Sequence, residues 1–270
     1  MTRVVILTGS ELRHVFFRKY IATSPDVEVI NTYCEGLEKS LHNLTTVDQD
    51  NFFRLKHLEA REQAEEDFFK LFIDSQEDKS RPISLPKGQI NDEKYTQQII
   101  NSNPDLLICY GSSIIKEPLL TFFKNRFLNV HLGLSPYYRG SGTNYWPLVN
   151  EEPEYVGATF MHIDAGVDTG EIIHQIRPRY SWNDTPSQIG TRFIAEMARE
   201  YLKIIINFNS LPTMPSLKSK AKDKLYKMKD YSEESVKILY ENFNNGLIKK
   251  YLEEKEERCS KVPIITNPLL

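Results

Sequence analysis

The sequence predicts an α/β fold, in which a doubly wound, mostly parallel sheet is followed by a short, mainly helical C-terminal extension. The chain opens with a strand–helix–strand pattern: an apolar run at residues 4–9, a helical face at 11–22 and an alternating segment at 27–32. Further short apolar runs follow, which is typical of buried parallel strands. After Pro215 the chain becomes rich in lysine and then helical in pattern. Together these features indicate an open sheet with helices on both faces.

The first half of the chain alternates between strands and helices. The run VVILTG ends at Gly9, as expected of a buried strand that enters a turn. Residues 48–75 form one long amphipathic pattern, which we interpret as a helix lying on the sheet. A short strand at 83–85 and a helix at 92–101 come next, and Asn103-Pro104 ends that helix.

The second half supplies four more strands and a clear helix start. The predicted strands are residues 106–110, 127–132, 157–163 and 171–177. A capping-box pattern then begins a helix that runs to about residue 209, with Thr185 as N-cap, Pro186 in the first turn and Gln188 at the third position.

The chain is expected to divide unequally. Ser232 caps a further helix, the sequence Asn244-Asn245-Gly246 ends it, and a second short helix is expected at 247–256. We therefore predict a catalytic domain at residues 1–212 and a helical extension at 213–270.

Composition excludes several classes of protein. The 270 residues carry 34 basic and 37 acidic side chains, so the net charge of −3 offers no general attraction to nucleic acid or to an anionic membrane. The N-terminal apolar run is too short for a signal peptide, and no apolar stretch is long enough to cross a membrane. The three scattered cysteines do not form a disulfide framework. A cytoplasmic globular protein is expected.

Candidate chemical groups gather between residues 129 and 170. Asn129 and His131 stand two residues apart in a predicted strand, so both side chains point to the same face. Asp168 lies in a second glycine-rich loop that follows another strand. An amide can donate to an oxyanion, an imidazole can move a proton near neutral pH, and a carboxylate can orient the imidazole. Such a set suits addition to a carbonyl group.

Each of these residues also has a structural interpretation. His131 at the end of a strand can be a satisfied structural residue, and Asn129 can close a turn through its backbone contacts. Asp168-Thr169-Gly170 can be an ordinary hairpin turn.

Three motifs in order resemble the formyltransferases that use 10-formyltetrahydrofolate. They are Asn129-Val-His131-Leu-Gly-Leu-Ser-Pro136, then Gly157-Ala-Thr-Phe-Met-His162, then Asp168-Thr-Gly170-Glu-Ile-Ile173. The resemblance covers roughly residues 106–208, and the first strand also fits. The chain departs from the family pattern at Leu132-Gly133, where Pro-Ser is usual, and at Ser135, where Leu is usual. These departures concern the substrate more than the reaction.

The resemblance implies a role for each matching residue. Asn129 would hold the formyl oxygen as it becomes an oxyanion, His131 would assist, and Asp168 would orient His131 and relay the proton of the attacking amine. The folate ring of the co-substrate would lie between two loops, at Ser113, Ile114, Ile115 and Lys116 and at Ile163, Asp164 and Ala165. The acceptor would meet Gly9, Ser10, Arg139 and Gly140. Cys109 is expected to be a core residue, His162 is left open between a structural and a functional role, and no metal is expected.

The resemblance leaves the acceptor open among several amines. We expect a small-molecule amine, on an amino sugar that is linked to a nucleotide. Tyr137, Tyr138, Tyr145 and Trp146 suit stacking on a sugar or base, with ordinary packing as the alternative. The short extension and the slightly acidic charge disfavour methionyl-tRNA, whose enzymes carry a larger β-barrel, although the lysine-rich stretch at 218–229 speaks for it.

Three further alternatives remain. The N-terminal loop Thr8-Gly9-Ser10-Glu11 lacks a full phosphate-binding loop, which disfavours glycinamide ribonucleotide as the acceptor. A formyltetrahydrofolate hydrolase is disfavoured because those enzymes begin with a regulatory domain and this chain begins with the sheet. A binding protein with a decayed site is disfavoured because all three polar residues are present. The sequence leaves a homodimer open.

Overall fold

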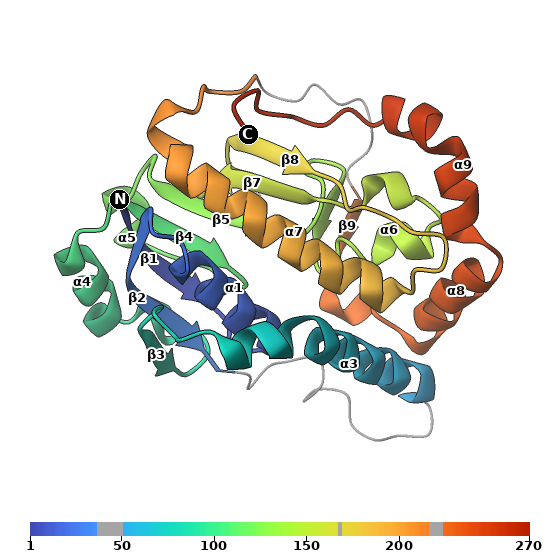
Figure 1. Ribbon diagram of the computed structural model, residues 1–270, viewed down its shortest axis with the longest axis horizontal. Coiled ribbons are helices and arrows are strands. Elements are labelled where there is room, and N and C mark those ends of the chain that lie inside the picture. Colours follow the sequence, from blue (N-terminus) through green and yellow to red (C-terminus); the bar gives the residue numbers. More distant parts are fainter. Residues whose placement is uncertain (37–50, 167–168, 216–223) are drawn as a thin grey trace.

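The fold is a seven-stranded sheet with helices on both faces, seen in a computed structural model that describes residues 1–36, 51–166, 169–215 and 224–270 (Figure 1). The strand order is β3-β2-β1-β4-β5-β7-β8. The strands are β1 (Thr2–Thr8), β2 (Val27–Glu35), β3 (Pro82–Leu85), β4 (Leu106–Tyr110), β5 (Phe127–His131), β7 (Ala158–His162) and β8 (Ile172–Ile176). The doubly wound fold predicted from the sequence is confirmed.

The first five strands in this order are parallel, and the last two are antiparallel to their neighbours. Strand order reverses between β1 and β4, because β2 and β3 lie to one side of β1 while β4 and β5 lie to the other. In open α/β sheets this reversal leaves a crevice at the carboxyl ends of the two strands. The fold therefore points to the ends of β1 and β4 as the place for a ligand.

Helices cover the two faces unequally. One face carries α1 (Leu12–Ala22), α3 (Phe52–Ser75) and α7 (Pro186–Asn207), whose apolar residues share a core with Val4, Ile108 and Val130 of the sheet. The other face carries α4 (Glu93–Ser102) and the short α5 (Leu119–Phe122). Figure 1 shows α7 crossing in front of the sheet, with α1 and α3 beside it.

The helix start predicted at Thr185 is confirmed. The Thr185 hydroxyl accepts a hydrogen bond from the Gln188 backbone amide, and the Gln188 side chain accepts one from the Thr185 amide. The same reciprocal arrangement joins Ser232 and Ser235 at the start of α8 (Glu233–Asn244). These bonds satisfy backbone donors that would otherwise be unpaired in the first turn of each helix.

The C-terminal residues pack closely on the catalytic part. Strand β9 (Lys224–Tyr226) pairs in parallel with β6 (Tyr138–Gly140). A third apolar core combines residues from both sides of the predicted boundary at 212/213. Its members include Leu134, Tyr138 and Trp146 together with Leu239, Leu247 and Ile248.

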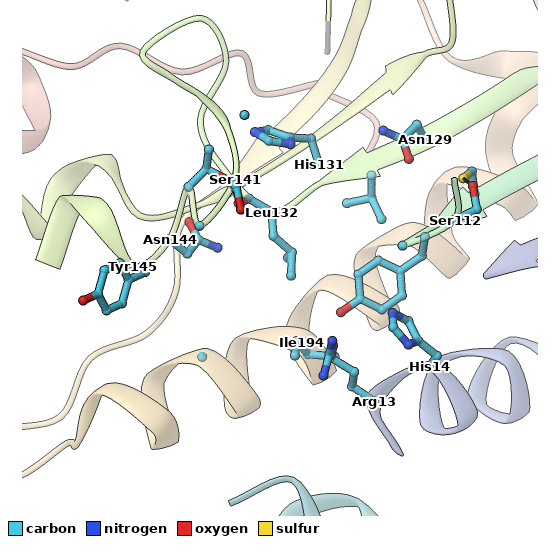
Figure 2. A pocket seen from close by; sticks show the side chains of 18 of the residues that line it. Arg13, His14, Ser112, Asn129, His131, Leu132, Ser141, Asn144, Tyr145 and Ile194 are labelled. Atoms are coloured by element: carbon cyan, nitrogen blue, oxygen red, sulfur yellow. Dashed lines mark hydrogen bonds between the residues drawn. The ribbon is translucent and has the colours of Figure 1, made fainter. Parts of the chain in front are cut away.

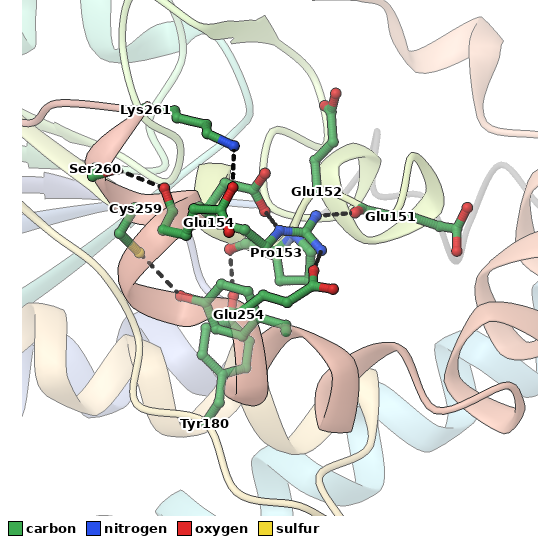
Figure 3. A network of polar contacts seen from close by, with 12 residues as sticks. Glu151, Glu152, Pro153, Glu154, Tyr180, Glu254, Cys259, Ser260 and Lys261 are labelled. Atoms are coloured by element: carbon green, nitrogen blue, oxygen red, sulfur yellow. Dashed lines mark hydrogen bonds and ion pairs between the residues drawn. The ribbon is translucent and has the colours of Figure 1, made fainter.

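Polar contacts also join the C-terminal extension to the catalytic part, where helix α9 (Leu247–Ser260) meets residues 151–154 (Figure 3). In α9, the Arg258 guanidinium donates to the Glu154 carboxylate at 2.9 Å and to the Glu151 carbonyl oxygen. The Tyr137 hydroxyl donates to the Pro263 carbonyl oxygen at 2.7 Å. Because core and polar network are shared, the extension is built into the same folded body as the sheet.

The described part of the chain contains no helix that is both long and apolar enough to cross a membrane. The three cysteines are free thiols.

Candidate active site

A cavity of about 970 Å³ opens where the strand order reverses. Arg13 and His14, which follow β1, line it together with Gly111 and Ser112, which follow β4. Asn129 and His131 of β5 contribute another wall, and helix α7 closes the cavity on the face opposite them (Figure 2). This volume lies at the upper end of what small-molecule and cofactor sites enclose.

Strand β5 brings Asn129 and His131 to the cavity together, as their spacing predicts. Asn129 is half-buried and His131 is buried. Nε2 of His131 lies 3.4 Å from the Tyr138 carbonyl oxygen. Figure 2 shows both side chains on the same strand, facing the cavity from one side. Asp168 lies outside the described residues, so its part in the site stays a prediction.

The loop that follows His131 is held by hydrogen bonds from the two antiparallel strands. The Thr159 hydroxyl donates to the Gly133 carbonyl oxygen at 2.7 Å and accepts from the Ser135 amide at 3.0 Å. The Gln175 side chain donates to the Ser135 carbonyl oxygen at 2.8 Å. The sequence departs from the family pattern at Gly133 and Ser135. These hydrogen bonds hold the backbone of both residues in one conformation.

Gly133 itself is required by a close approach. A Cβ at this position would lie 2.6 Å from Nε2 of His131 and equally close to the Thr143 side chain. Real Cβ atoms do not approach other atoms so closely, so any larger residue would displace the imidazole. Gly133 thereby lets the chain pass directly against His131.

The loop after β4 forms the second wall. Ser113, Ile114 and Ile115 line the cavity, as the family resemblance implies. The buried Glu35 carboxylate at the end of β2 accepts from the Ser113 amide and, at 2.7 Å, from the Gly88 amide. Its charge is further matched by Lys87, whose ammonium lies 3.4 Å away. A single buried carboxylate therefore ties two loops together.

Asn91 holds the same loop from the outside. Its side-chain amide donates to the Ile114 carbonyl oxygen at 2.9 Å, and its side-chain oxygen accepts from the Lys116 amide at 2.8 Å. Three backbone groups of this loop are thus engaged by Glu35 and Asn91. A ring bound here would have to use the remaining backbone groups of the loop. Neither residue was expected from the sequence, and Glu35 lies beyond the strand predicted at 27–32 because β2 extends to Glu35.

The loop after β7 reaches the cavity through Ile163, Asp164 and Ala165. The Asp164 carboxylate is engaged within this loop, because it accepts from the Gly166 amide at 2.9 Å and from the Thr169 hydroxyl at 2.8 Å. Strand β7 is antiparallel to β5, with His162 opposite Leu128. The loop after β7 therefore starts at the amino end of β5, and not at the carboxyl ends of the parallel strands.

Several predicted site residues do not line the cavity. Gly140 lines it, but Gly9, Ser10, Arg139 and Lys116 are not among its lining residues. The His14 ring occupies the space beside Gly9, where a Cβ would lie 2.7 Å from the ring. The acceptor and folate contacts proposed for these four residues stay predictions.

The aromatic residues divide between packing and the cavity. Tyr137, Tyr138 and Trp146 are buried in the third core, which favours their packing interpretation. Tyr145 lines the cavity, and its hydroxyl lies 2.7 Å from that of Ser235.

Cys109 lines the cavity but is poorly suited to be a nucleophile. Burial raises the pKa of its thiol to about 11, and its Sγ lies 2.8 Å from the Ser112 hydroxyl. Since the thiolate is the reactive form, this side chain stays a core thiol at neutral pH, as predicted.

Polar residues of α1 and α3 that the sequence did not single out form a further wall. Nη1 of Arg13 donates to the Glu65 carboxylate at 2.9 Å, and its other terminal nitrogen pairs with Glu11. Arg61 lies 3.7 Å from both carboxylates. Two guanidinium groups thus face two carboxylates, and the network as a whole is close to neutral.

Two histidines stand in the same wall, His14 buried and His57 half-buried. Burial, with the charges of Arg13, Lys87 and Arg61, lowers the pKa of His14 well below its usual value. Burial lowers the pKa of His57 to about 4, and its Nδ1 lies 3.1 Å from the Tyr240 hydroxyl. Both imidazoles are therefore neutral at physiological pH. Because they lie on separate helices, no spacing rule in the sequence could link them.

Comparison with known proteins agrees with this geometry. The family model described as formyl transferase matches residues 54–205, more than half of the chain. The methionyl-tRNA formyltransferase of Clostridioides difficile (strain 630) is 32% identical over 134 residues, 48% of this chain and 42% of that protein. That of Finegoldia magna is 37% identical over 93 residues, 34% of this chain and 29% of that protein. The chain thus matches less than half the length of these relatives.

Solved structures share the fold. A sugar N-formyltransferase from a Shewanella species has a TM-score of 0.54 at 17% identity, covering 86% of this chain and 78% of that one. A 4-N formyltransferase from Francisella tularensis has the same TM-score and identity, with 88% and 86% covered. Phosphoribosylglycinamide formyltransferase from Anaplasma phagocytophilum has a TM-score of 0.53 at 15% identity, with 84% and 98% covered. Because the family model matches more than half of the chain, from α3 to α7, this chain belongs to the formyl transferase family.

Proposed function

We propose that this protein transfers a formyl group from 10-formyltetrahydrofolate to a primary amine on an amino sugar that is linked to a nucleotide. The observation that carries the proposal is the placement of Asn129 and His131 side by side at a large cavity, in a chain of the formyl transferase family. The loops at Ser113–Ile115 and Ile163–Ala165 line the same cavity, which supports a flat ring between them.

The amine nitrogen would attack the formyl carbon, and the formyl oxygen would gain negative charge. The Asn129 amide would donate to this oxyanion, and His131 would assist from the neighbouring position on β5. On the family pattern alone, Asp168 would orient His131 and take up the amine proton through water. Collapse of the tetrahedral intermediate would break the bond to N10 of the folate, which leaves as tetrahydrofolate after protonation.

An amino sugar fits the cavity better than a large nucleic acid. The wall of α1 and α3 pairs its guanidinium groups with carboxylates, so it offers little net charge to a phosphate backbone. Tyr145 and His57 add aromatic surface, with their rings 5.7 Å apart. Aromatic rings and balanced polar groups are suited to a sugar.

Methionyl-tRNA is the second candidate, because the relatives reported above carry that name. Glycinamide ribonucleotide and hydrolysis to formate are the remaining alternatives. One experiment separates all four: incubate the protein with 10-formyltetrahydrofolate and, in turn, nucleotide-linked amino sugars, methionyl-tRNA, glycinamide ribonucleotide and no amine. A formyl mass gain on an amino sugar is the expected result. A mass gain only on methionyl-tRNA or glycinamide ribonucleotide, or formate release without any amine, would contradict the proposal.

A further inference from the structure

Among the glycines whose surroundings the structure describes, Gly190 is the one whose presence the protein's own packing does not explain. Every other glycine with described surroundings either has a positive φ or has an atom within 3 Å of where a Cβ would lie. Gly190 has neither: its φ is not positive, and a Cβ there would meet no atom within 4 Å. It stands inside a 22-residue helix, α7, where glycine is among the least favourable residues.

The empty space beside Gly190 belongs to the cavity. Ser187, Gly190, Thr191 and Ile194 follow the spacing of one helical face, and all four line the cavity. Alanine here would favour the helix and clash with nothing in the protein. The absence of a side chain is therefore best explained by a molecule that approaches the helix backbone.

Polar atoms without a hydrogen bond also line this cavity. The Ser187 hydroxyl is more than nine-tenths buried, lies one turn before Gly190 and makes no hydrogen bond within the described part of the chain. The Tyr110 hydroxyl is also buried and makes no hydrogen bond to the residues that the structure describes. Nε of Arg61 makes none either, although it lies 3.7 Å from the Glu65 carboxylate. Both residues line the cavity. Buried polar groups are nearly always paired, so these three atoms mark where a ligand's polar groups would lie.

The charged residues on the cavity wall formed by α1 and α3 favour a sugar over a phosphate as the ligand. Arg13 and Arg61 are already opposed by Glu11 and Glu65, so an isolated phosphate would find little unmatched positive charge. Donors and acceptors alternate there, and this suits the hydroxyl groups of a sugar, each of which both donates and accepts. Figure 2 shows Arg13 and Ile194 across the cavity from Asn129 and His131.

We propose that Gly190 is a specificity-determining residue. Because it has no side chain, the sugar ring of the acceptor can pack directly over the Gly190 Cα on α7. The ring hydroxyls then bond to the Ser187 hydroxyl and to the Arg61–Glu65 pair. This inference rests on the proposed function and assigns the acceptor, rather than the folate, to this part of the cavity.

The test compares Gly190→Ala, Gly190→Leu and a control on the same helix. Arg199→Leu adds the same side chain nine residues later, on the opposite face of α7, where the residue is exposed. The readouts are the Tm, the dissociation constant of tetrahydrofolate, and the dissociation constant and KM of UDP- and dTDP-linked sugars that carry an amine at C2, C3 or C4.

We expect Gly190→Ala to raise the Tm by about 2–4 °C, because it removes a poor helix former at no steric cost. Gly190→Leu should raise the dissociation constant and KM of the amino sugar at least ~10-fold and leave tetrahydrofolate binding unchanged. Arg199→Leu should change neither binding constant.

Three results would overturn the inference. A lower Tm in Gly190→Ala would show that the fold needs the glycine, and unchanged amino-sugar binding in Gly190→Leu would show that no ring packs there. Weakened tetrahydrofolate binding in Gly190→Leu would assign the space to the folate. Failure of the proposed function looks different: the wild-type protein would then formylate none of the amino sugars, whatever the effect of Gly190→Leu on their binding.

Discussion

The Thr159 hydroxyl donates to the Gly133 carbonyl oxygen at 2.7 Å and accepts from the Ser135 amide at 3.0 Å, so one side chain on β7 fixes the loop that passes beneath His131. The register of β5 with β7 places His131 opposite Thr159. The residue that holds the loop after His131 is therefore also the neighbour of His131 across the sheet. The position of the imidazole thus depends on two strands that lie antiparallel in an otherwise parallel sheet.

Gly133→Ala should lower turnover about 100-fold, because its Cβ would push the His131 ring from its place. Tetrahydrofolate affinity, measured by calorimetry, should stay within about twofold, since Gly133 is not among the residues that line the cavity. Wild-type turnover in this variant would show that the position of His131 is unimportant.

Glu35→Gln should weaken tetrahydrofolate binding by about 10-fold, because a neutral amide holds the Ser113 and Gly88 amides less firmly than a carboxylate does. The matched control is Glu28→Gln on the same strand, where the carboxylate makes only longer surface ion pairs with Arg3 and Arg81. Equal effects in the two variants would contradict a specific role for Glu35.

Stability should fall as the pH drops from 7 to 5, in part through His57. The pKa of His57 is about 4 in the folded protein and near 6.5 when unfolded, so between these values the unfolded state binds more protons. The contribution of His57 to the unfolding free energy is fully present above about pH 6.5 and is lost toward pH 4. By pH 5 the loss amounts to about 2 kcal/mol.

Urea unfolding of His57→Asn and the wild-type protein at pH 7 and pH 5 measures this difference. The variant should lose less unfolding free energy on acidification than the wild type. The same loss in both proteins would mean that the pKa of His57 is not lowered in the folded protein.

Leu239→Ala should lower the unfolding free energy by about 2–4 kcal/mol, because this side chain is fully buried in the core shared by sheet and extension. Leu225→Ala is the control, since Leu225 is 59% exposed in the same extension. A single unfolding transition that moves as a whole is expected. Two separate transitions, with only one shifted, would instead support independent domains at 1–212 and 213–270.

The sequence alone predicts β1 and β4 well, because their apolar runs are continuous and are followed by a glycine. It does not predict the pairing of β6 with β9, which joins two three-residue strands more than eighty residues apart. Such pairing depends on packing between Trp146 and Tyr226, whose rings stack at 4.2 Å, and no local pattern encodes it. The antiparallel direction of β7 is likewise a property of the assembled sheet.

The residues of the candidate site also divide into those that the sequence could identify and those that it could not. Asn129 and His131 could be recognised because both lie in one strand at a two-residue spacing. Glu35, Asn91 and Arg61 could not, because each acts through a partner on another element, and Gly190 could not, because the empty space beside it exists only in the folded cavity. Their roles depend on distances that only the fold sets.

The rate of formyl transfer by Asn129→Ala tests the central claim most directly. With 10-formyltetrahydrofolate and the acceptor found by the mass assay, we predict a fall in kcat of about 100- to 1,000-fold, with tetrahydrofolate affinity unchanged and with wild-type rates in the exposed control Asn101→Ala. A near wild-type kcat for Asn129→Ala would contradict the assignment of this amide to the oxyanion, and with it the site described for this cavity.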